Sequence, residues 1–213
     1  MQPGTSWNEK TRQAEIARIE NTFNHRDHAL ALRNLSKVLT WAGKFDDADR
    51  LALDAVSQLP DDFEAHFLAG NAELRRGNSQ EAISHFETTV KLNPNHVTAL
   101  NNLGNQYFQL GNLELAAKYF QQSVSVDSRF AMGIHNLGVV KMELGELAAA
   151  EELFSQALAI EPDRFDSHTM LSKLYFQQQR YQEATHHMER AVEIRPDAEA
   201  ARADLQMLKQ MVQ

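Results

Sequence analysis

The chain has 213 residues, of which 43% are hydrophobic and 23% charged, and its formal net charge is -8. It holds nine glycines and five prolines, about half of their usual combined share, which argues against a sandwich or barrel with many turns and favours helices joined by short links. The negative charge argues against nucleic acid as a partner, because binding phosphates requires a basic surface.

Residues 1–28 form an N-terminal tail and one expected helix over residues 7–26. Ser6 and Glu9 have the spacing of a capping box, and Ile16, Ile19 and Phe23 follow at helical spacing. We expect this helix to cap the first repeat described below. The first ten residues lack the charged start and apolar core of a secretory signal, so a cytoplasmic location is expected.

The middle of the chain is periodic, with a constant difference of 34 in residue number between matching positions. One such period separates Pro60 from Pro94 and Pro162 from Pro196, and Ser128 occupies the middle position. Two series of glycines keep the same period, and Gln179 takes the fifth place of the first: Gly43, Gly77, Gly111 and Gly145, then Gly70, Gly104 and Gly138. Chance does not produce this regularity.

The third repeat carries a recognisable pattern. Leu103-Gly104 is followed by an aromatic at Tyr107, and then by Ala116 and Phe120. This resembles the tetratricopeptide repeat. The resemblance covers five repeats with these ranges: 29–62, 63–96, 97–130, 131–164 and 165–198. It implies an all-α fold, a right-handed superhelical solenoid of antiparallel helix pairs.

Each repeat is expected to hold two helices, in the third over about 97–110 and 113–126. The recurring glycine falls between them, where the chain needs a positive φ, and the recurring proline ends the second helix. Gln179 has to make this turn without glycine, by strain or by a longer turn. Gly104 and Ala116 let the two backbones approach, and Phe120 fills the remaining space.

Residues 199–213 predict a solitary C-terminal helix that caps the array. Its apolar residues recur on one face: Ala201, Leu205, Leu208 and Val212. For both ends an alternative stays open, in which the helix is a dimerisation surface or a link to a further domain.

The sequence offers no catalytic constellation. The absence of cysteine excludes a disulfide, a thiolate metal site and a cysteine nucleophile. The nine histidines include repeat-matched residues, His66 with His168 and His85 with His187, but matched residues lie in separate repeats and cannot share a metal. We therefore expect no enzyme, metal or cofactor, and the lack of a long apolar run predicts no membrane span.

The resemblance also implies a ligand groove on the concave face, formed by certain positions of each first helix. Asparagine is concentrated at these positions, and its amide offers both donors and an acceptor to a peptide main chain. The expected binding residues are Arg33, Asn34, Lys37, Trp41, Phe67, Asn71, Asn101, Asn102, Asn105, His135, Asn136 and Lys173. The alternative is a solvated polar face that only prevents aggregation.

Two details refine this expectation. Asn71 and Asn102 match asparagines with which some family members clamp a terminal carboxylate, but Phe67 stands where that clamp has lysine. Gripping of extended main chain is therefore favoured over a clamp. Two roles stay open for Trp41, a binding anchor or packing against the N-terminal helix.

The expected function is a non-catalytic interaction module that binds an extended peptide or a partner helix. Two alternatives remain. One is a self-assembling unit that forms a homo-oligomer through its end helices, and the other is the interaction domain of a larger enzyme, such as a glycosyltransferase.

Overall fold

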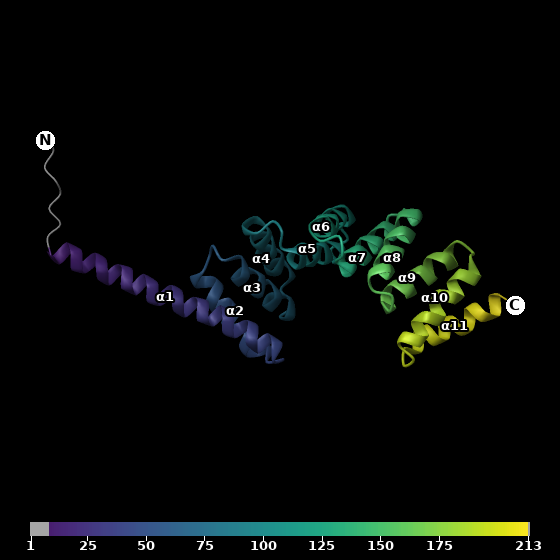
Figure 1. Ribbon diagram of the computed structural model, residues 1–213, viewed down its shortest axis with the longest axis horizontal. Helices are drawn as coiled ribbons and strands as arrows, with labels where there is room; N and C mark the ends of the chain where they lie inside the picture. The colour runs from purple at the N-terminus through teal and green to yellow at the C-terminus, as the bar shows by residue number, and fades with distance from the viewer. Residues whose placement is uncertain (1–8, 213) are drawn as a thin grey trace, which may run out of the picture. The chain divides into compact units, whose positions relative to one another are not determined.

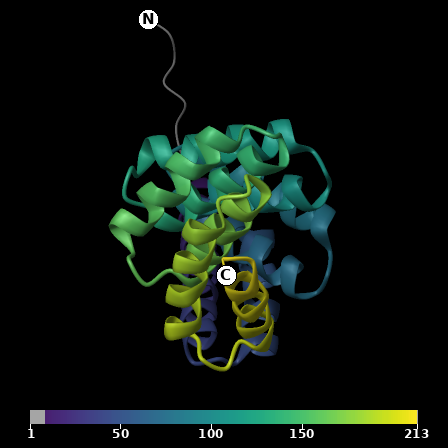
Figure 2. The ribbon, with the colours of Figure 1, turned by 90° about the vertical axis from the view of Figure 1, so that its right-hand side faces the viewer.

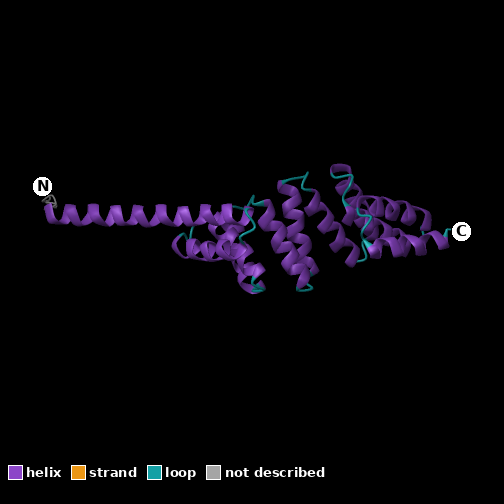
Figure 3. Ribbon diagram, turned by 90° about the horizontal axis from the view of Figure 1, so that it is seen from below, coloured by secondary structure: helices purple, strands orange, loops and turns teal. Residues whose placement is uncertain are grey.

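The computed structural model describes residues 9–212, with side chains from residue 24 onward. Within that range the regular elements are eleven α-helices (Figure 3). The chain divides into two compact units, Met1–Pro94 and Asn95–Gln213. The all-α fold of antiparallel helix pairs expected from the sequence is confirmed.

The first unit contains four helices (Figure 1). They are α1 (Glu9–Trp41), α2 (Phe45–Gln58), α3 (Phe63–Arg75) and α4 (Ser79–Leu92). Consecutive helices pack on one another, and Ala29, Leu59 and Ala65 join α1, the end of α2 and α3 in one buried cluster.

The second unit contains seven helices. They are α5 (Val97–Gln109), α6 (Leu113–Val126), α7 (Ala131–Glu143), α8 (Leu147–Ile160), α9 (Phe165–Gln177), α10 (Tyr181–Ile194) and α11 (Glu199–Met211). α11 lies beside α10 (Figure 2), and its Ala201 and Leu208 are buried in the core that α8 to α11 share. Val212, expected on the same face, is exposed at the end of the helix.

The repeated turn between the helices of a pair needs a residue of positive φ. The four glycines of the first series adopt it, with φ between 73° and 81°. Gln179 adopts it too, at φ 60°, and its turn has the same hydrogen bonds, since Arg180 N donates to Tyr175 O just as Asn112 N donates to Tyr107 O. The turn at Gln179 is therefore no longer than the others, and Gln179 adopts a strained positive φ in the place of glycine.

Close approach within a helix pair depends on the second series of glycines. A Cβ added to Gly104 would lie 2.6 Å from the ring of the buried Phe120. Gly70 meets Phe86 in the same way, and Gly138 meets Phe154. The space-filling role expected of Phe120 therefore recurs in three successive repeats.

The link that contains Ser128 lacks the proline of the matching links but makes the same turn. Phe130 N donates to Asp127 O at 3.1 Å, the same backbone bond that Asp62 N makes to Leu59 O in a proline-containing link. In addition, Arg129 N donates to Asp127 Oδ1 at 2.9 Å. The aspartate side chain thus holds the turn that proline restricts elsewhere.

The N-terminal region differs from the expectation. Instead of a separate helix over 7–26, α1 runs unbroken for 33 residues and includes the first helix of the first repeat. Residues 25–28 contain neither glycine nor proline, so nothing in them ends the helix. Ser6 lies outside the described residues, and the packing expected of Ile16, Ile19 and Phe23 lies outside the described side chains.

Candidate functional site

Three of the expected asparagines meet in the second unit. Asn101 and Asn105 lie on α5, one helical turn apart, and Asn136 lies on α7. Asn136 Nδ2 donates to Asn101 Oδ1 at 2.9 Å and to Asn105 Oδ1 at 3.3 Å. We call these three residues the asparagine cluster.

The cluster has a buried side and an accessible side. Asn101 is 1% exposed, and its Nδ2 has no hydrogen-bond partner among the described residues. Asn105 and Asn136 are half-buried. Both Nδ2 hydrogens of Asn136 are engaged within the cluster, so its Oδ1 and the Nδ2 of Asn105 are polar groups that these two hydrogen bonds do not use.

His135 is a core residue in this structure. Its ring packs against Phe154 at a centroid distance of 5.4 Å, and its Nδ1 lies 2.9 Å from Ser167 Oγ. Burial, together with the positive charge of Arg164, lowers the pKa of His135 to about 4, while Asp166 opposes this shift. Of the other expected residues in this unit, Asn102 is half-buried and Lys173 is exposed.

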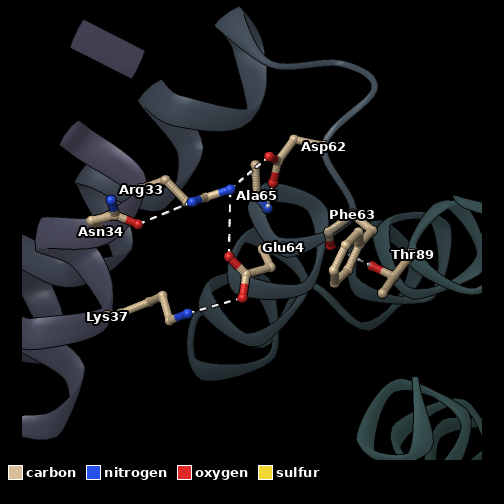
Figure 4. A network of polar contacts seen from close by, with 8 residues as sticks. All are labelled: Arg33, Asn34, Lys37, Asp62, Phe63, Glu64, Ala65 and Thr89. Atoms are coloured by element: carbon tan, nitrogen blue, oxygen red, sulfur yellow. Dashed lines mark hydrogen bonds and ion pairs between the residues drawn. The ribbon is translucent and has the colours of Figure 1, made fainter. Parts of the chain in front are cut away.

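The basic residues expected in the first unit are paired with acids (Figure 4). Arg33 Nη1 lies 2.6 Å from Asp62 Oδ2 and 3.4 Å from Glu64 Oε2, and the same guanidinium donates to Asn34 Oδ1 at 3.1 Å. Lys37 Nζ lies 2.9 Å from Glu64 Oε1. These ion pairs join α1 to the start of α3, so the positive charge expected there is largely compensated.

The remaining expected residues of the first unit divide by exposure. Phe67 and Asn71 are half-buried, and the Phe67 ring lies 6.0 Å from that of Phe86. Trp41 is 91% exposed, so within the described side chains it does not pack on a neighbouring helix. The binding role of Trp41 stays a prediction.

Two histidine pairs are a feature that sequence reasoning missed. His66 Nδ1 lies 3.1 Å from His85 Nδ1, and His168 Nδ1 lies 3.0 Å from His187 Nδ1. Repeat-matched histidines lie in separate helix pairs, whereas His66 faces His85 within one helix pair and His168 faces His187 within another. The signal was present, since the same spacing along the chain separates the two members of both pairs.

A hydrogen bond to a backbone carbonyl sets the tautomer of one neutral ring in each pair. His66 Nε2 donates to Pro60 O at 2.9 Å and His168 Nε2 donates to Pro162 O at 3.0 Å, so in the neutral ring Nδ1 is the acceptor. Burial lowers the pKa of His187 to about 4. The nearby His168 and His186 also lower this pKa, and Glu151 opposes the shift. In the described residues, no group of three or more histidines and acids is arranged to hold a metal ion.

Comparison with known proteins agrees with the fold and the repeat. Models of the tetratricopeptide repeat match residues 42–88, 68–129 and 141–209, which together cover most of the chain. The chain belongs to the tetratricopeptide repeat family.

Solved structures show the same fold. YrrB, described as a tetratricopeptide repeat protein with an unusual peptide-binding site, is 20% identical, and the match covers 84% of this chain and 92% of that one, with a TM-score of 0.68. TTC0263 of Thermus thermophilus is 26% identical over 85% and 99% of the two chains, with a TM-score of 0.66. MamA of Desulfovibrio magneticus RS-1 is 22% identical over 81% and 98%, with a TM-score of 0.70.

The curated relatives match only a short segment. Protein O-mannosyl-transferase TMTC1 of Homo sapiens is 39% identical over 56 residues, which make up 26% of this chain and 6% of that protein. The match in Mus musculus has the same extent. This chain therefore spans a small part of the length of the curated relatives that it matches.

Together these observations support a scaffold for protein–protein interaction, the general role of tetratricopeptide repeat proteins, which are mostly non-catalytic adaptors. None of the helices in the described range has the length and apolar composition required to cross a bilayer.

Proposed function

We propose that the second unit binds the main chain of an extended peptide through Asn105 and Asn136. One observation carries the proposal: the shared hydrogen bonds of the asparagine cluster leave the Asn105 donor and the Asn136 acceptor beside each other on α5 and α7. A peptide unit offers the complementary acceptor and donor, its C=O and N–H. Main-chain contacts of this kind give affinity without demanding one sequence.

The other members of the site have supporting roles. Asn101 holds Asn136 from the buried side, and the neutral His135 bonds to Ser167 and positions the inner face of α7. Neither reaches a ligand directly.

An array of unrelated synthetic peptides tests this function. Each lost hydrogen bond costs about 0.5–1.5 kcal/mol, so Asn105→Ala with Asn136→Ala is expected to weaken binding to the captured peptides about tenfold. N-methylation of the contacted amide in a captured peptide is expected to have a similar effect. Gln122→Ala, an exposed change on α6, serves as the matched control.

Weaker binding by the double variant, but not by Gln122→Ala, would support the asparagine cluster as the binding site. Equal binding by the double variant and the wild type would exclude the asparagine cluster as the site. Folding is checked by melting. Gln122→Ala should leave the melting temperature nearly unchanged, because exposed polar substitutions are usually within about 0.5 kcal/mol. The double variant should melt at a lower temperature but remain folded, because it takes the donor Asn136 Nδ2 away from the buried Asn101 Oδ1.

We further propose that the chain itself has no catalytic activity. The resemblance to an O-mannosyl-transferase over 56 residues favours a shared repeat over a shared reaction, since it extends over 6% of that enzyme. The interaction domain of a larger enzyme remains the second candidate, and a cytoplasmic location remains a prediction.

A further inference from the structure

One face of α1 is uncovered although its counterparts in all later repeats are buried. The face consists of Ala31, Leu35 and Val38, of which Leu35 is 48% and Val38 58% exposed. We call it the α1 face. The residues at the matching positions of the later repeats are all buried: Ala65, Ala69, Ala72, Ala99, Leu103, Gln106, Gly133, Leu137, Val140, Ser167, Leu171 and Leu174.

Within each unit the preceding helix covers these positions. Leu137 and Val140 of α7 cluster with Ala116 and Phe120 of α6. In the same way Leu171 and Leu174 of α9 cluster with residues of α8. In the first unit, α2 covers α3, where Ala65 packs with Leu59 and Val56. In the part of the chain that the structure describes, the α1 face therefore lacks a helix in the position that α2, α6 and α8 occupy.

The chain's own candidate for that position does not reach it. Residues 11–24 stand one repeat period before α2 (Phe45–Gln58), yet they continue α1 in a straight line away from α2 to α4 (Figure 1 and Figure 3). A fold-back would need a turn over residues 25–28, where Arg26 stands in the place of Pro60. The unbroken helix keeps residues 11–24 away from the α1 face of their own chain.

The repeat period also indicates where the two-fold axis would lie if two copies of the chain paired through their α1 helices. The link between α2 and α3 covers residues 59–62, and its midpoint lies between Pro60 and Asp61. One period earlier are Arg26 and Asp27, both exposed. Two antiparallel α1 helices centred at this point place each Arg26 opposite Asp27 of the partner subunit, so opposite charges meet across the axis.

We propose that two copies of this chain pair through antiparallel α1 helices, with residues 11–24 of each covering the α1 face of the other. The segment has the composition of a covering helix, since Ala14 stands in the slot of the fully buried Ala48 and Ile16 and Ile19 are apolar. The contact is isologous and closes on itself, as an exchange of identical elements does. It does not depend on the peptide-binding function proposed above.

Light scattering during size exclusion, over a range of concentrations, measures the mass of the full chain. The wild type is expected to be a dimer, and Leu35→Glu with Val38→Glu a monomer. Leu110→Glu with Leu144→Glu is the matched control, because both leucines are exposed but lie outside α1, and it is expected to remain a dimer. Circular dichroism verifies that each variant is folded.

Because the chain has no cysteine, a single introduced thiol reports the axis. A short thiol-specific cross-linker is expected to link Asp27→Cys into a covalent dimer. The Gln122→Cys variant is expected to remain uncross-linked. A wild type that is monomeric at every concentration would overturn the proposal, as would a dimer that persists in the Leu35→Glu, Val38→Glu variant or the absence of linkage through residue 27.

Discussion

Gln179 is the one residue other than glycine with a positive φ among the described residues, at 60°. A left-handed conformation costs a residue with a Cβ about 1–2 kcal/mol. We expect Gln179→Gly to raise the free energy of unfolding by about 1 kcal/mol, measured by urea denaturation.

Gly145→Gln supplies the reciprocal control. A Cβ at Gly145 meets nothing within 4 Å, so this change tests the backbone cost alone and should lower the stability by a similar amount. If Gln179→Gly is neutral while Gly145→Gln destabilises, contacts of the Gln179 side chain outweigh its backbone strain.

Buried histidines make stability depend on pH in a definite direction. The pKa of His187 and that of His135 are lowered in the fold to about 4, mainly by burial, from the ordinary value of 6.5. Between these values the unfolded chain binds more protons than the folded one, so stability falls as the pH decreases from about 6.5 towards 4. Urea denaturation at a series of pH values measures this slope.

The contribution of His187 can be separated from that of the acids. His187→Phe keeps an aromatic ring beside Tyr175 and removes the titrating group, so the stability of this variant should depend less on pH between 6.5 and 5. An identical slope in the variant and the wild type would show that His187 titrates normally in the fold.

At the scale of the helices and their links, the turn before α7 lacks the proline found in the other four links. Its hydrogen bonds come from Arg129 and Phe130 to Asp127, and Ser128 occupies the proline position. Ser128→Pro is therefore expected to stabilise the chain by about 0.4–1 kcal/mol, chiefly by restricting the unfolded state.

Asp127→Ala is expected to destabilise the chain, because the hydrogen bond from Arg129 N to Asp127 Oδ1 is lost. Thermal melts of both variants check this pair of expectations.

The helix pairs could be predicted because the repeat period places turn formers and small residues at fixed points. Gly104 and Phe120 were correctly paired, since a ring that fills the space above a glycine needs only local sequence information. The unbroken α1 was missed, although Arg26 in the proline position indicated it. A missing turn signal is harder to interpret than a present one.

The site was less predictable for a physical reason. The repeat period indicates on which face of a helix a residue lies, but it does not give the distance from that residue to the neighbouring helix. Asn101 and Asn105 both occupy expected groove positions, yet only Asn101 is almost completely buried. The two histidine pairs depend on the offset between the helices of one repeat, which the period does not contain.

For the whole molecule, a linear array makes stability a sum of contacts between neighbours. A defect in one helix pair should therefore be felt near it and not throughout the chain. Phe86 in the first unit and Phe154 in the second occupy the same slot and are both fully buried, so they form a matched pair of probes.

We expect Phe154→Leu to cost about 1 kcal/mol and to speed hydrogen exchange in α7 to α10, while exchange in α1 and α2 stays as in the wild type. Phe86→Leu should do the opposite, with faster exchange in α3 and α4. Exchange followed by mass spectrometry resolves these segments. A uniform increase over both units would mean that the array opens as one cooperative block. Restriction to the mutated unit would mean that each unit holds its own core, so that peptide binding by the second unit does not require the first to be intact.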